Sequence, residues 1–161
     1  MGQSFRVVDE TIACWVSVLV TTDNNATRRD PVKLLERLLE LVLCNYSTYG
    51  STYPWQVSRD FFDFDFSDWE TIEEEFWRDY EVVAFQVQQA WGLPNFRGSS
   101  LTLGYPEWYW ISVIEMCYWT REEGIAYISF HREDRELPYE ITLGAITEMA
   151  IEEIIELGLN R

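Results

Sequence analysis

Residues 108–132 read WYWISVIEMCYWTREEGIAYISFHR, and this stretch decides the fold. Its two apolar and aromatic halves, 108–119 and 125–132, are typical of β-strands. The charged, glycine-ended segment 121–124 (REEG) between them is typical of a turn. The stretch therefore predicts an antiparallel hairpin.

The register of this hairpin decides which side chains can meet. With a two-residue turn at 122–123, Glu115 faces Phe130. His131 then faces Ile114, and because side chains alternate along a strand, Glu115 and His131 project from opposite faces. Only a one-residue slip would bring them together, so we do not expect an acid–histidine dyad.

One face of the predicted hairpin is apolar except for Glu115. A carboxylate among apolar groups is costly unless it is paired, protonated or open to a cleft, so we expect Glu115 to reach an arginine, carry a proton or border a cleft. The other residues of this face are Ile111, Val113, Cys117, Trp119, Ala126, Ile128 and Phe130.

The opposite face mixes aromatic and hydroxyl groups, which suits a ligand groove or a protein interface unless a helix covers it. Its residues are Trp110, Ser112, Ile114, Met116, Tyr118, Tyr127, Ser129 and His131. A cleft beside the hairpin would use Trp110, Glu115, Tyr118, Tyr127 and His131.

Three helices are predicted, over residues of about 31–45, 68–91 and 143–157, from apolar stripes at helical spacing that follow capping residues. The capping residues are Asp30, Ser67 (which forms an S-x-x-E capping box with Glu70) and Thr142. Gly92 and Gly158 are typical stops.

The remaining segments are assigned from composition and alternation. Residues 13–22 fit a buried strand or a short helix, and residues 46–66 begin as a loop and end in an alternating strand at 62–66. Residues 93–106 resemble a connecting loop, and a short strand is expected at 139–141. With no repeat or linker, the chain 1–161 is expected to be one α+β domain with an antiparallel sheet.

Composition limits the partners. The chain has 28 acidic and 12 basic residues, a net charge of −16, which disfavours nucleic acid and anionic membranes and favours a basic protein partner. Without a long apolar run or a signal-like start we expect a cytoplasmic protein that does not enter a membrane. The three cysteines form no CxxC pair, and no metal or other cofactor is expected.

The acidic residues are concentrated at residues 60–81, where ten of them accompany Arg78 as the one basic residue. Helix capping accounts for the carboxylates nearest Ser67 but not for those further along. An EF-hand does not fit Asp60, Asp63 and Asp65, because the turn glycine is missing. We predict an acidic binding surface formed by Asp63, Asp65, Glu73, Glu74, Glu75 and Asp79.

Catalytic motifs are absent, and His131 is the single histidine, so no catalytic residue is assigned and an enzyme is not favoured. The leading hypothesis is a non-catalytic interaction protein that binds a basic protein, as an inhibitor, an immunity protein or a nucleic-acid mimic does. The alternative is a small-molecule-binding domain or small enzyme that uses the cleft beside the hairpin. A homodimer through the second hairpin face is a third hypothesis.

Overall fold

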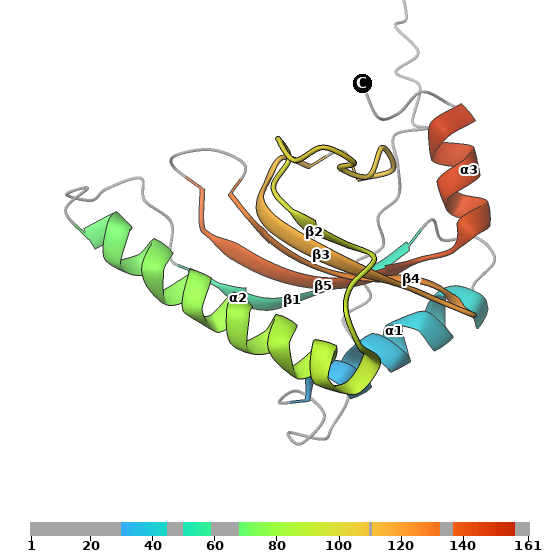
Figure 1. Cartoon of the computed structure of the whole chain (residues 1–161), viewed down its shortest axis with the longest axis horizontal. Helices are drawn as coiled ribbons and strands as arrows, with labels where there is room; N and C mark the ends of the chain where they lie inside the picture. Colours follow the sequence, from blue (N-terminus) through green and yellow to red (C-terminus); the bar gives the residue numbers. More distant parts are fainter. Residues whose placement is uncertain (1–29, 45–49, 59–67, 110, 133–136, 157–161) are drawn as a thin grey trace, which may run out of the picture.

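The protein is an α+β structure in which helices pack on a five-stranded antiparallel sheet of order β1-β5-β4-β3-β2 (Figure 1). The computed structural model describes residues 30–44, 50–58, 68–109, 111–132 and 137–156. The helices are α1 (Pro31–Cys44), α2 (Trp69–Trp91) and α3 (Glu148–Glu156), and the strands are β1 (Gly50–Val57), β2 (Phe96–Gly98), β3 (Val113–Arg121), β4 (Gly124–His131) and β5 (Glu140–Ile146).

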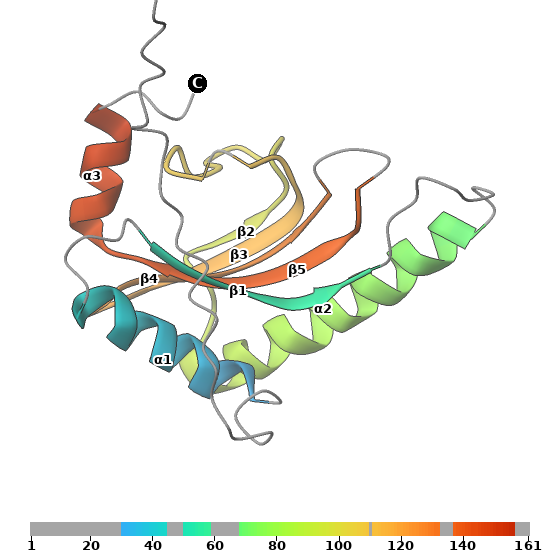
Figure 2. The same ribbon diagram turned by 180° about the vertical axis from the view of Figure 1, so that it is seen from behind.

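Helices α1 and α2 cover one face of the curved sheet, and Figure 2 shows both on its convex side. Helix α1 buries most of the predicted stripe, namely Leu35, Leu38, Leu39 and Val42. Helix α2 buries Phe76, Tyr80, Val83, Ala84 and Val87 against the same core. The periodic residues of both helices therefore form the main hydrophobic core with β4 and β5.

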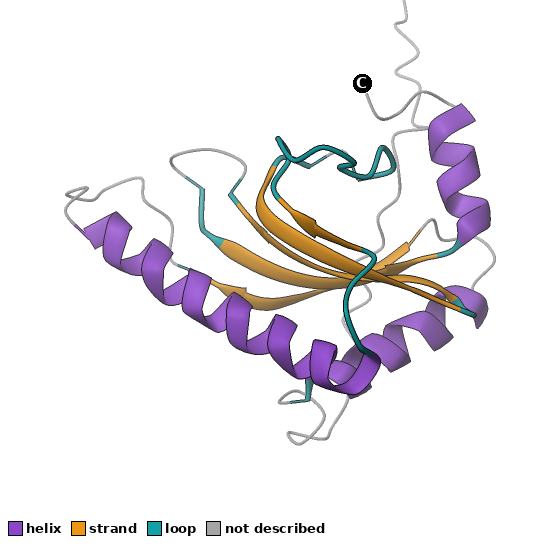
Figure 3. Ribbon diagram, viewed as in Figure 1, coloured by secondary structure: helices purple, strands orange, loops and turns teal. Residues whose placement is uncertain are grey.

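Loop residues between β2 and β3, together with α3, lie on the other face of the sheet (Figure 3). Trp108 and Tyr109 of this loop pack on Tyr127, with ring centroids 5.7 Å and 5.1 Å apart. Tyr127 lies across Gly144 of β5, where an added Cβ would come within 2.2 Å of the tyrosine ring. The second face is therefore a smaller aromatic core, covered mainly by a loop and not by a long helix.

The hairpin register is confirmed near its turn and changes further along. Arg121 pairs with Gly124 and Glu115 with Phe130, but a bulge between Val113 and Glu115 places Val113 opposite His131. The prediction that Ile114 faces His131 was wrong because a bulge inserts one extra residue.

The bulge also exchanges side chains between the two faces. Val113 packs in the aromatic core and Ile114 against the helix-side core, the reverse of the prediction. Ile111, also expected on the helix side, packs on the aromatic core. Glu115 and His131 still occupy opposite faces.

Several boundaries differ from those predicted. Strand β1 lies in the segment expected to be a loop, and the short β2 lies within 93–106. The described residues of 108–112 belong to the loop, so β3 begins only at Val113. Strand β5 extends through Ile146, so Thr142 is a strand residue, and Thr147 caps α3 by accepting a hydrogen bond from the Ala150 N–H.

Some predicted features lie outside the described residues: the strand or helix at 13–22, the strand at 62–66, the Ser67 cap and the side chain of Trp110. In the described ranges, no helix has the length and apolar character that crossing a membrane requires.

Candidate functional site

A cavity of about 750 Å³ opens along the first half of α2. Two rows of side chains, each repeating every four residues, reach it from one side of the helix, because positions four apart lie on the same face of an α-helix. The described residues that line it are Trp69, Glu70, Glu73, Glu74, Trp77, Arg78 and Glu81.

The two tryptophans give the cavity its apolar surface. Each contacts one residue near the end of β4 and keeps 38% of its surface exposed. Trp77 packs edge-on against Phe130 of β4, with ring centroids 5.9 Å apart. The guanidinium of Arg132 lies 5.9 Å from the ring centroid of Trp69. Both indoles are therefore oriented by the fold and still available to a ligand.

Two of the four glutamates already have partners from elsewhere in the fold. Glu73 accepts a 2.5 Å hydrogen bond from the Tyr139 hydroxyl. Burial and this contact with Glu73 raise the pKa of Tyr139 to about 12. This hydrogen bond therefore joins Glu73 of α2 to the segment that precedes β5.

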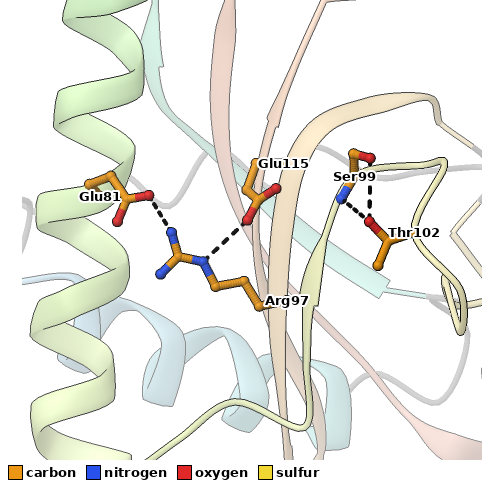
Figure 4. A network of polar contacts seen from close by, with 5 residues as sticks. All are labelled: Glu81, Arg97, Ser99, Thr102 and Glu115. Atoms are coloured by element: carbon orange, nitrogen blue, oxygen red, sulfur yellow. Dashed lines mark hydrogen bonds and ion pairs between the residues drawn. The ribbon is translucent and has the colours of Figure 1, made fainter.

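Glu81 pairs with Arg97 of β2, which also donates to Glu115 of β3 at 3.2 Å (Figure 4). Burial lowers the pKa of Arg97, but the hydrogen bond to Glu115 and the charge of Glu81 outweigh it and the pKa is raised. Arg97 is thus a permanent cation between α2 and the sheet edge. Among the three expectations for Glu115, the structure shows pairing with an arginine.

Glu70 and Glu74 are different, because no residue in the described part of the chain forms an ion pair with either. Both are exposed, and both line the cavity next to the tryptophans. Arg78 lines the cavity one turn beyond Glu74 without forming an ion pair to it. Among the described residues, the unpaired negative charge of the cavity therefore comes from Glu70 and Glu74, and Arg78 adds one unpaired positive charge.

The predicted acidic surface is only partly gathered at this cavity. Glu73 and Glu74 line it, whereas Glu75 and Asp79 do not. Asp79 instead accepts a 2.8 Å hydrogen bond from the Gln56 side chain of β1. Asp63 and Asp65 lie outside the described residues.

The residues predicted to form a cleft beside the hairpin are only partly brought together. Tyr118 and Tyr127 pack on Trp108, with ring centroids 5.8 Å and 5.7 Å away. Burial raises the pKa of Tyr127 well above its ordinary value. Glu115 projects from the other face of the sheet, and Trp110 lies outside the described residues.

His131 is buried at the end of β4, beside the polar residues of the aromatic core. The Tyr109 hydroxyl donates to Ser129 Oγ at 2.8 Å, and Ser129 Oγ lies 3.5 Å from His131 Nδ1. Ser129 is fully buried, and neither it nor His131 lines the α2 cavity. Within the described residues, no group of three or more histidine, cysteine or acidic side chains is placed to hold a metal ion.

The sequence pattern placed Glu70 in a capping box, and Trp69, Trp77, Arg78 and Glu81 were not predicted as site residues. The signal that could have found them is the four-residue repeat of tryptophan and glutamate from Trp69 to Glu81.

Comparison with protein-family models, with curated proteins and with solved structures found no match to this chain. A role for the protein is therefore inferred from the geometry and charge of the cavity along α2.

Proposed function

We propose that this protein is a non-catalytic interaction protein that binds a basic segment of another protein in the cavity along α2, in the manner of an inhibitor, an immunity protein or a nucleic-acid mimic. One observation carries the proposal. The unpaired carboxylates of Glu70 and Glu74 lie beside the half-exposed indoles of Trp69 and Trp77 around one cavity of about 750 Å³.

This combination suits an arginine or lysine side chain better than other groups. A cation placed over an indole gains about 0.5–2 kcal/mol, and a nearby carboxylate adds a charge-assisted hydrogen bond. The fold already uses such contacts internally, since Arg121 lies 4.9 Å from the ring centroid of Trp91. A ligand cation would reproduce an interaction that this structure makes elsewhere.

The net charge of −16 supports the same partner class. Charge of one sign accelerates the approach of oppositely charged partners, and salt weakens the effect because the Debye length is about 8 Å at physiological ionic strength. Long-range attraction acts on any basic chain, so the cavity must supply the selectivity.

The test is isothermal titration calorimetry of the full chain with a hexa-arginine peptide, at low and at high salt. We expect binding that the double variant Glu70→Gln/Glu74→Gln weakens about tenfold or more, because two unpaired contacts are removed. The matched control is Glu36→Gln/Glu75→Gln, which removes the same charge from exposed helix positions that do not line the cavity.

Equal weakening by both double variants would assign the binding to net charge alone and overturn the proposal. No binding of hexa-arginine at low salt would overturn it as well.

A further inference from the structure

We infer, on the basis of the proposed function, that the segment bound along α2 is an extended strand with two cationic side chains at alternate positions, followed at the next alternate position by an acidic residue. The cavity's charged row sets this pattern. Glu70, Glu74 and Arg78 follow one another at four-residue intervals on α2, in the order minus, minus, plus.

The spacing of this row matches an extended chain. Four residues of an α-helix advance about 6 Å along the axis. Side chains on one side of an extended chain repeat every two residues, about 6.6–6.8 Å apart. Three alternate residues of a strand therefore span about 13 Å, against about 12 Å from Glu70 to Arg78.

The length of the cavity sets the number of residues that an extended segment along α2 would need. The row of lining residues from Trp69 to Glu81 covers about 18 Å of α2. An extended chain advances about 3.3 Å per residue, so a segment of about five residues spans this length.

The second row of the cavity contributes shape more than charge. Glu73 and Glu81 are engaged by Tyr139 and Arg97, so they have less to offer a ligand. Trp69 precedes Glu73 in this row and Trp77 lies between Glu73 and Glu81, and both indoles present apolar surface that the aliphatic stems of arginine or lysine can cover. Glu70, Glu74 and Arg78 therefore determine which charged side chains of a ligand the cavity binds.

The test uses three peptides of identical composition with blocked ends, titrated into the full chain at low salt while tryptophan fluorescence is followed. The matching peptide is Ala-Arg-Ala-Arg-Ala-Glu-Ala. The two controls are Ala-Arg-Ala-Glu-Ala-Arg-Ala, with the acid in the middle, and Ala-Arg-Arg-Ala-Ala-Glu-Ala, with adjacent arginines. We expect the matching peptide to bind about fivefold more tightly than either control.

The variant Arg78→Glu supplies a second test, because residues 70, 74 and 78 of α2 are then all negatively charged. It should abolish the preference for the matching peptide and favour Ala-Arg-Ala-Arg-Ala-Arg-Ala.

The outcomes separate this inference from the proposed function. If the three peptides bind equally and Glu70→Gln/Glu74→Gln weakens all of them, the charge pattern is wrong and the basic-partner proposal stands. If none binds while hexa-arginine does, the pattern is again wrong. If hexa-arginine also fails to bind, the proposed function itself fails.

Discussion

The guanidinium of Arg97 lies 3.2 Å from the carboxylate of Glu115 on the neighbouring strand. Glu115 lies on the mostly apolar helix-side face of the hairpin, and its side chain is only 16% exposed. The same arginine reaches Glu81 of α2, so one cation joins the sheet edge to the helix that carries the cavity (Figure 4).

Replacing Arg97 by methionine should lower the free energy of unfolding by about 1–3 kcal/mol, because Glu115 would be left without its partner in a mostly apolar setting. Urea denaturation measures the effect. A double-mutant cycle with Glu115→Met should show that the double variant loses less than the sum of the two single variants.

The matched control for this pair is Arg37→Met on α1. Arg37 contacts Glu40 at 2.7 Å, but both side chains are more than half exposed, so its removal should cost less than about 1 kcal/mol. Equal losses at Arg37 and Arg97 would contradict the role given to Arg97.

Residue 144 must be a glycine because the ring of Tyr127 occupies the space that a Cβ would need. Gly144→Ala should therefore cost about 1–3 kcal/mol through overpacking of the aromatic core, measured by urea denaturation. The cost should be smaller when the same substitution is made in a Tyr127→Leu background. An identical cost in both backgrounds would show that the ring is not the cause.

The elements that the sequence predicted well are those specified by local pattern. The stripe of α1 and the turn pairing of Arg121 with Gly124 depend on neighbouring residues only. Strand β1 was missed because it contains Pro54 and is stabilised by pairing with the distant β5. It is an edge strand with a register shift after Pro54, a place where proline is tolerated.

The helix start at Thr147 shows the same limit. Thr142 and Thr147 both precede apolar residues, and each could serve as a cap. The choice is made by β5, which pairs with β1 on one side and β4 on the other and so keeps Thr142 in the sheet. No local pattern contains that information.

The candidate site was predictable only in part for a related reason. The excess of acid on α2 is visible in the sequence. Which carboxylates stay unpaired depends on Tyr139, which lies just before β5, and on Arg97 of β2, because these two residues contact Glu73 and Glu81. Glu70 and Glu74 become the candidate ligand groups only once those contacts are known.

Stability should fall above pH 10 partly through Tyr139. Its pKa is raised from 10.0 to about 12 by burial and by Glu73, so the folded state holds the phenol proton more tightly than the unfolded state does. This contribution is fully present below pH 10 and is lost as the pH rises towards 12. The variant Tyr139→Phe should therefore lose stability less steeply than the wild type between pH 10 and 12.

Urea denaturation at several pH values across this window measures the two slopes. Glu73→Gln should also reduce the slope of the wild-type curve, because it removes the charge that opposes ionisation of Tyr139. Parallel curves for the wild type and Tyr139→Phe would contradict the assignment.

Arg78 is the one cation among the described residues that line the cavity, and it should repel a basic ligand. Arg78→Gln is therefore expected to tighten the binding of hexa-arginine about three- to tenfold at low salt, because a like charge beside the site is removed. The gain should shrink as salt is added, since the site is open to solvent and exposed charges are screened. The matched control is Arg121→Gln, which removes the same charge at the end of β3, where Arg121 stacks on Trp91 and not on the cavity. Equal gains from both variants would mean that the overall charge of the protein, and not the cavity along α2, sets the affinity for basic chains.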